Sequence, residues 1–206
     1  MRTSAPVRAA AVGLSVAALL LVAGPSGATA RRRPSDVSGA VLTLGDMPTA
    51  WSVYVQPATS PGVRRTKGTC GGPYRAPTPT EAEATAAFAL DDDAGPVFGE
   101  RIERYAPGHT PATSAGLLRD MPCTRTDGPV RWRATPLRRV HLREADTEYL
   151  LRELSGPFPF TYNDEYRVWR GDDVIAVVLS SRTPDRKLAE TLTRRAVARY
   201  DASASG

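Results

Sequence analysis

Few side chains in this 206-residue sequence have the type and spacing that catalysis requires. The two histidines are His109, which follows Pro-Gly, and His141, which lies in the charged run RRVHLRE; neither belongs to a catalytic motif. The carboxylate pair Asp164-Glu165 falls at an expected turn, whereas acid–base catalysis of glycoside hydrolysis needs two carboxyl groups facing each other across a cleft. No Gly-x-Ser-x-Gly motif for a nucleophilic serine occurs after residue 30. We therefore predict that the protein is not an enzyme, with a secreted hydrolase as an alternative.

The N-terminus has the pattern of a secretory leader. Arg2 and Arg8 precede an apolar run over 9–23, and a small-residue Ala-Thr-Ala site ends at Ala30. A run of about 15 residues is short for the hydrocarbon core of a bilayer, which needs about 20. We expect cleavage between Ala30 and Arg31, which gives a secreted protein without a stable membrane anchor. The three arginines after the leader oppose the usual charge asymmetry, so an uncleaved anchor is the alternative.

Two cysteines, Cys70 and Cys123, follow the leader. An exported domain with an even number of cysteines usually pairs them. The bridge would close a loop of about 54 residues and stabilise the domain by about 4 kcal/mol in the chain-entropy model. A thiol nucleophile or a metal ligand is the alternative, but there is no Cys-x-x-Cys motif, and the acidic run 91–93 lacks the spaced oxygens of a calcium loop. We expect a disulfide, and no metal or cofactor.

Four arginines in the segment VRWRATPLRR support a second hypothesis, the binding of an anionic polymer of the cell envelope. They are Arg131, Arg133, Arg138 and Arg139, and strand alternation places the first two on one face. Guanidinium groups in a row could bind phosphates bidentately. The overall charge argues little, because 25 basic residues (27 minus two in the leader) face 22 acidic ones. We expect a solvated basic strand face, keep polymer binding as the alternative, and expect no nucleic-acid partner because export removes it.

The spacing of apolar residues predicts the elements that position these side chains. Strands are expected at 51–55, 83–90, 96–105, 129–140, 147–154, 165–169 and 174–181, the last apolar on both faces as in a central strand. Helices are expected at 111–121 and, after a Thr183 cap, at 184–200. The Pro- and Gly-rich residues 56–79 form a long loop around Cys70. The apolar phase shifts between Val97 and Ile102, which predicts a bulge at Gly99.

The Arg-Gly-Asp sequence at 170–172 has the letters of a cell-adhesion motif. It lies between the expected strands YRVW and VIAVVL, where the chain must reverse within a few residues. Gly171 and Asp172 tolerate the positive φ angles of tight hairpin turns. We therefore interpret Arg-Gly-Asp as the turn of a hairpin and not as an adhesion signal.

Together these elements predict a single α+β domain, in which an antiparallel sheet packs against two or more helices. The leader occupies 1–30, a flexible lead-in 31–40, the domain 41–201 and a disordered tail 202–206. The composition, 41% hydrophobic and 24% charged, is that of a folded soluble domain and excludes disorder along the whole chain.

Several short motifs resemble the PknH-like extracellular sensor domains, which hang outside actinobacterial receptor kinases and also occur as free secreted proteins. The motifs are LTLGDMPTAW, Cys70 in a long loop, SAGLLRDMPC ending at Cys123, the hairpin YRVWRGDDVIAVVLS and the closing amphipathic helix. The sequence has one cysteine pair where that domain has two, and no kinase segment. The resemblance implies an antiparallel sheet with helices around a cleft, and ligand binding without catalysis. We therefore expect an exported binding or sensor-like module whose partner is a small molecule, a lipid or a cell-envelope component.

Overall fold

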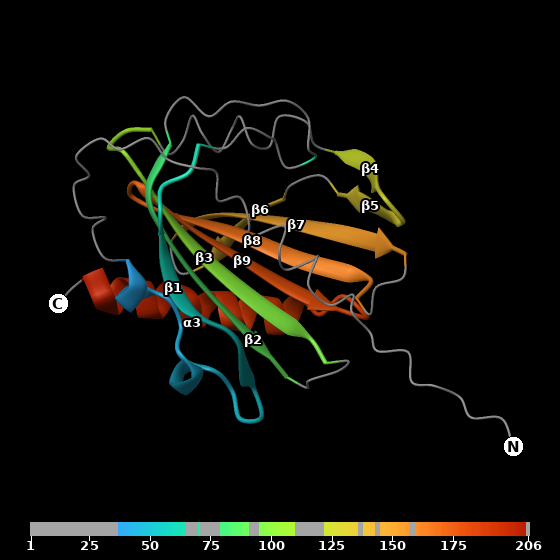
Figure 1. Ribbon diagram of the computed structural model, residues 1–206, viewed down its shortest axis with the longest axis horizontal. Coiled ribbons are helices and arrows are strands. Elements are labelled where there is room, and N and C mark those ends of the chain that lie inside the picture. Colours follow the sequence, from blue (N-terminus) through green and yellow to red (C-terminus); the bar gives the residue numbers. More distant parts are fainter. Residues whose placement is uncertain are drawn as a thin grey trace, which may run out of the picture.

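The computed structural model describes residues 37–64, 70, 79–90, 95–109, 122–135, 138–142, 145–156 and 160–204. Within them, one antiparallel sheet packs against a single α-helix, α3 (Arg186–Ala204), which runs along one face of the sheet (Figure 1). Two 3₁₀ turns, η1 (Ser38–Ala40) and η2 (Leu44–Asp46), precede the sheet. The antiparallel sheet is as predicted. Of the two or more helices expected, the described part contains α3, and the helix expected at 111–121 lies outside the described residues.

In the described residues, nine strands are hydrogen-bonded in the order β1-β2-β3-β9-β8-β7-β5-β4, and β6 pairs with β7. Their bounds are β1 Ser52–Pro61, β2 Thr80–Ala89, β3 Val97–Tyr105, β4 Cys123–Asp127, β5 Val130–Ala134, β6 Arg138–Leu142, β7 Ala145–Ser155, β8 Tyr162–Arg170 and β9 Asp173–Ser181. β5 and β6 occupy successive stretches of one edge of β7, because the other edge pairs with β8. The early strands and the late strands meet at the β3–β9 pair.

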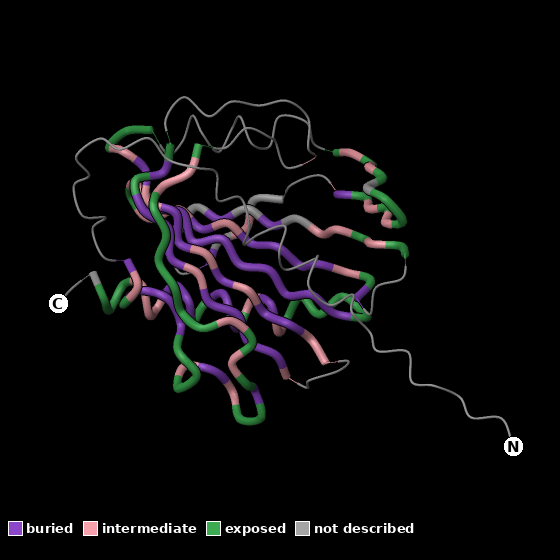
Figure 2. The backbone as a smooth tube through the Cα atoms, in the orientation of Figure 1, coloured by how far each residue is buried: buried purple, intermediate pink, exposed green. Residues whose placement is uncertain are grey.

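The hairpin of β8 and β9 lies in the middle of the sheet. All residues of β9 are buried, which fits its predicted central position, whereas β1 at the edge is largely exposed (Figure 2). The ladder closes with Arg170 opposite Asp173, so the turn consists of Gly171 and Asp172. Gly171 has a φ of 58°, in the left-handed region that glycine adopts without strain. The Arg-Gly-Asp sequence is therefore the hairpin turn, as predicted.

α3 buries one stripe of small and aliphatic residues against the sheet. Leu192 and Ala196, both from the predicted stripe, have no exposed surface and belong to the main core. The predicted cap is wrong: Asp185, not Thr183, begins the helix, and its Oδ1 accepts the N–H of Leu188 at 2.9 Å. A carboxylate at this place also interacts favourably with the helix dipole. The helix continues to Ala204, beyond the predicted domain end.

Residues 37–47, which we call the N-terminal segment, belong to the folded domain. Val37 is 2% exposed, and Val41 and Leu42 have no exposed surface. All three lie in the main core, and η1 contacts α3. Ala40 is also buried there, so the domain includes residues that the sequence assigned to the lead-in.

Several strand predictions need correction. β1 continues into the stretch expected as a loop, β4 was not predicted, and the strand expected at 129–140 is two strands, β5 and β6. The bulge predicted at Gly99 is wrong, because the register of β3 with both neighbours is unbroken there. The phase shift arises because Glu100 occupies a buried position on the α3-facing side, between Phe98 and Ile102, where an apolar residue was expected.

Cys70 and Cys123 form a disulfide, and their Cα atoms are 6.1 Å apart. Cys123 is the first residue of β4, so the bridge connects the loop after β1 to the opposite edge of the sheet. The predicted pairing is confirmed. It leaves no free cysteine for a nucleophile or a metal ligand. The acidic run at 91–93 lies outside the described residues.

Candidate functional site

Some buried charged side chains bind α3 and fix it to the sheet. Most of the other buried charged side chains lie on the face of the sheet opposite α3. Partners across an antiparallel ladder share a face. Ile175, Val177 and Leu179 of β9 belong to the α3-facing core, so Ala176 and Val178 point to the other side. The ladders place several charged or amide side chains on that side, and we call seven of them the polar face: Glu83 of β2, Arg101 and Glu103 of β3, Arg152 of β7, and Asn163, Glu165 and Arg167 of β8.

An ion pair on the polar face joins β7 to β8. Arg152 Nε lies 2.9 Å from Glu165 Oε1, and the Glu165 side chain is 7% exposed. The Arg152 guanidinium also lies over the Trp132 ring, 5.3 Å from its centroid, in a cation–π contact. Asn163 is buried opposite Arg152 in the ladder, and its Oδ1 accepts no hydrogen bond from the described residues. A buried amide acceptor without a donor therefore lies beside the ion pair.

A second group of the polar face lies toward β2. Glu103 is buried, contacts the guanidinium of Arg101 at 2.5 Å and accepts the hydroxyl of Tyr105 at 2.5 Å. Glu83 of β2 stands directly opposite Glu103 and accepts the hydroxyl of Thr80 at 2.8 Å. Like charges opposite each other on neighbouring strands are unfavourable. The Arg101 charge and the two hydroxyl donors offset this repulsion.

The carboxylate pair Asp164-Glu165 lies within β8, not at the turn that the sequence predicted. Neighbouring residues of a strand point to opposite faces. Glu165 therefore meets Arg152 on the polar face, whereas Asp164 lies under α3. The two carboxyl groups diverge and cannot act together on one substrate. His109 follows β3 outside the sheet, and the side chain of His141 lies outside the described part.

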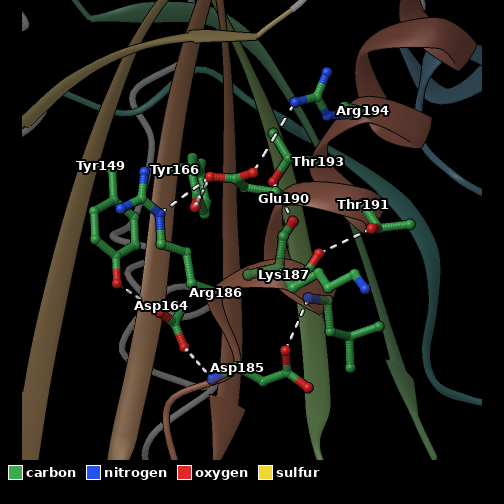
Figure 3. Close-up of polar contacts among 12 residues, drawn as sticks. Tyr149, Asp164, Tyr166, Asp185, Arg186, Lys187, Glu190, Thr191, Thr193 and Arg194 are labelled. Atoms are coloured by element: carbon green, nitrogen blue, oxygen red, sulfur yellow. Dashed lines mark hydrogen bonds and ion pairs between the residues drawn. The ribbon is translucent and has the colours of Figure 1, made fainter.

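Asp164 belongs to a cluster that holds the start of α3 (Figure 3). Its Oδ1 accepts the Tyr149 hydroxyl at 2.6 Å, and its Oδ2 accepts the backbone N–H of Asp185 at 3.0 Å. The Arg186 guanidinium lies 4.8 Å from the centroid of the Tyr149 ring. The Tyr166 hydroxyl donates to Glu190 at 3.3 Å, and burial raises the pKa of Tyr166 above its ordinary value. The cluster joins β7 and β8 to the helix, and its contacts are satisfied within the protein.

A second cluster holds the end of α3 beside the Arg-Gly-Asp turn. Asp173 accepts three hydrogen bonds from Arg104, at 2.9 Å, 3.2 Å and 2.7 Å, and one from the Tyr200 hydroxyl at 2.7 Å. Burial and the bond to Asp173 raise the pKa of Tyr200 to about 12. Arg170 pairs with Asp201 at 3.0 Å, and Asp172 accepts the N–H of Gly108 at 2.9 Å. The turn is therefore tied to the protein by its own side chains.

The structure confirms only part of the row of arginines that the sequence predicted on this strand. Arg131 and Arg133 are exposed on one face of β5, as predicted, but Glu153 stands directly opposite Arg133. The side chains of Arg138 and Arg139 lie outside the described part, although β6 itself is present. The structure thus brings two of the four arginines together, beside an opposite charge.

Sequence inspection missed the polar face, although β8 carries a signal of it. In YNDEYRVWR, the residues Asn163, Glu165 and Arg167 alternate with Asp164, Tyr166 and Val168. A polar residue at every second position of a strand next to a mainly apolar strand marks a polar surface over the core. Ladder neighbours such as Arg152 could not be assigned without the register.

The part of the chain that the structure describes contains no group of three His, Cys, Asp or Glu residues that could hold a metal ion. Its helices also include none that is long and apolar enough to cross a membrane.

Comparison with solved structures places this arrangement of strands and helix among known folds. The extracellular domain of PknH from Mycobacterium tuberculosis superposes with a TM-score of 0.59 over 85% of this chain and 98% of that domain, at 10% sequence identity. The chain has the fold of the PknH extracellular domain. This confirms the fold that the short motifs implied. The Rv0999 ortholog from Mycobacterium smegmatis matches over 81% of this chain and 97% of its own, with 12% identity and a TM-score of 0.47.

Comparisons of the amino-acid sequence with family models and with curated proteins find no match. At 10% identity the likeness to PknH concerns the backbone fold and assigns no site residue.

Proposed function

We propose that the protein is a non-catalytic, sensor-like domain exported to the cell envelope, and that its polar face binds the ligand. The observation that carries the proposal is the set of half-buried Arg152 and buried Asn163 and Glu165 on the sheet face opposite α3. The fold shared with an extracellular domain and the disulfide support a location outside the cell.

The energetics of the polar face favour a role beyond folding. Moving an arginine and a glutamate out of water costs more than their attraction usually returns, and apolar residues of the same size often stabilise a protein more. Asn163 adds an amide oxygen without a donor from the described residues, which is a further cost. Binding surfaces commonly contain such groups, because a ligand can complete their hydrogen bonds.

The chemistry of the polar face indicates the kind of ligand. It holds three arginines and three glutamates, so their net charge is zero (3 minus 3), and Asn163 adds a neutral acceptor. Donors and acceptors in similar number suit a small molecule or headgroup that is neutral or zwitterionic and carries hydroxyl or amine groups. A polyanion would require a more basic surface.

The first step of the test is to find which ligands stay bound when the protein is purified from its own host. Mass spectrometry of the native protein, purified under mild conditions, identifies small molecules or lipids that co-purify with it. Binding of the same compounds, or of fractions of a cell-envelope extract, is then compared in the double variant Arg152→Gln/Glu165→Gln. Removing both partners avoids a buried unpaired charge, so the fold is expected to survive. We expect at least about a tenfold loss of affinity, about 1.4 kcal/mol.

The double variant Arg131→Gln/Arg133→Gln, which changes exposed arginines of β5, is the matched control and should bind as the wild type does. Binding that is lost in the control and falls steeply with salt would instead show a polyanion binder. Chemical conversion of a fraction by the protein would contradict both and show an enzyme. Full binding by the Arg152→Gln/Glu165→Gln variant would remove the polar face from the proposal.

A further inference from the structure

The N-terminal segment, residues 37–47, is held from two sides. From α3, Arg195 Nη1 donates to the backbone oxygen of Asp46 at 2.7 Å. From the sheet, Glu100 of β3 accepts the backbone N–H of Leu42 on Oε2 at 2.8 Å. Leu42 itself has no exposed surface. One carboxyl group therefore fixes the backbone of the segment to β3.

Glu100 has the surroundings of an apolar core residue. It is 2% exposed, and its ladder partners are Ala86 and Val177. Phe98 and Ile102, which share its face of β3, have no exposed surface. Its Oε1 accepts no hydrogen bond from the described residues. A carboxylate with a single donor in such surroundings is unfavourable, so burial favours the protonated form.

The charges that face Glu100 come from the N-terminal segment and from α3. Asp46 of the segment repels a carboxylate, and Arg199 of α3 attracts it. β2 and β9 present Ala86 and Val177, which carry no charge. Burial is the largest effect, and it raises the pKa of Glu100 from 4.5 to about 8. Arg199 does not reverse this, and its Nε is also buried without a hydrogen-bond partner in the described part.

We propose that Glu100 is a proton-operated latch for the N-terminal segment: the segment is docked when Glu100 carries its proton, and it undocks when the proton is lost. Undocking lets water reach the carboxylate and breaks only the contacts of the segment itself. α3 keeps its own anchors on the sheet, at Asp164 near its start and Asp173 near its end. Ionisation therefore releases the segment without unfolding the sheet and the helix.

The direction of the pH effect follows from linkage. The pKa of Glu100 is 4.5 when free and about 8 when docked. A carboxyl group whose pKa is raised by docking stabilises the docked state fully at pH values below 4.5. This stabilisation decreases as the pH rises between 4.5 and 8, and it is lost above about 8. Inside this window the undocking constant rises about tenfold per pH unit, or about 50-fold from pH 6 to pH 8, and it levels off above.

Hydrogen exchange of the Leu42 amide in the purified protein tests the latch, because Glu100 holds this N–H. After correction for the intrinsic rate, its protection should fall about 50-fold from pH 6 to pH 8. Val177 in β9 and Leu192 in α3 should keep their protection. In Glu100→Gln, which has the shape of the protonated acid and no charge, Leu42 protection should stay constant. Glu81→Gln, which changes an exposed carboxylate of β2, should show the wild-type fall.

Constant protection of Leu42 in the wild type would overturn the latch. So would a fall shared equally by Val177 and Leu192, because that result means unfolding of the whole domain. If Glu100→Gln does not fold, the carbon-13 titration of the Glu100 carboxyl in the wild type decides. A midpoint clearly above 4.5 supports the latch, because undocking coupled to ionisation places it between the two values, and a midpoint near 4.5 overturns it.

Discussion

The change Asp164→Asn tests how the start of α3 is held on the sheet. Asp164 has no exposed surface and accepts two hydrogen bonds, from the Tyr149 hydroxyl at 2.6 Å and from the N–H of Asp185 at 3.0 Å. An asparagine keeps one acceptor and turns its amide nitrogen toward the other donor. The loss of one charge-assisted bond costs about 1.5–3 kcal/mol, and the buried donor left without an acceptor adds about 1–3 kcal/mol. We expect the free energy of unfolding to fall by about 3–5 kcal/mol.

Urea unfolding followed by circular dichroism measures this loss. With a slope of about 1–3 kcal/mol per molar urea, the midpoint should move by at least about 1 M. Tyr149→Phe removes one of the two donors and should cost about 1–2 kcal/mol alone. In the double variant the two costs should not add, because both changes break the same bond. An Asp164→Asn variant within about 0.5 kcal/mol of the wild type would refute this account of the anchor.

The remaining predictions concern the turn, the disulfide and the leader. Gly171→Val should lower the free energy of unfolding by about 1 kcal/mol or more, because the residue has a φ of 58°. Asp172→Asn keeps an acceptor for the N–H of Gly108 and should change the free energy of unfolding little. Urea titration compares the two variants, and a Gly171→Val variant as stable as the wild type would contradict the turn. Thiol titration of the unfolded, unreduced protein should find no reactive cysteine, and reduction of the Cys70–Cys123 bridge should cost about 4 kcal/mol of stability. Intact mass of the protein recovered from culture medium should correspond to a chain that begins at Arg31, and a full-length protein retained in the membrane would exclude cleavage.

The spacing of apolar residues was enough to predict an element where a single strand-like or helix-like periodicity runs through the whole segment. The apolar run of β9 predicted a strand covered on both faces, and the four-residue spacing of Leu192 and Ala196 predicted the buried stripe of α3. The Gly171 turn followed from backbone chemistry alone. These signals depend on neighbouring residues only, so they can be recognised before any tertiary contact is known.

The spacing of apolar residues gave wrong predictions where a polar residue occupies a buried position in a strand. Glu100 interrupts the apolar phase of β3, and this pattern alone predicts a bulge at Gly99 that the structure does not have. The pair Asp164-Glu165 predicts a turn because two adjacent carboxylates are unusual in a central strand, yet each has a partner on its own face, Tyr149 for Asp164 and Arg152 for Glu165. In all these cases the compensating partner comes from another strand or from backbone far away in sequence.

The central hairpin, the amphipathic helix and the pairing of Cys70 with Cys123 could all be predicted from the amino-acid sequence. Each follows from residue type and spacing along the chain, or from the small number of possible partners. Tertiary packing set the strand order and the ladder register, and with them which charged side chains meet. Arg152 meets Glu165, and Leu42 meets Glu100 across 58 positions of sequence, because side chains on a sheet are brought together by register and packing and not by proximity in the chain.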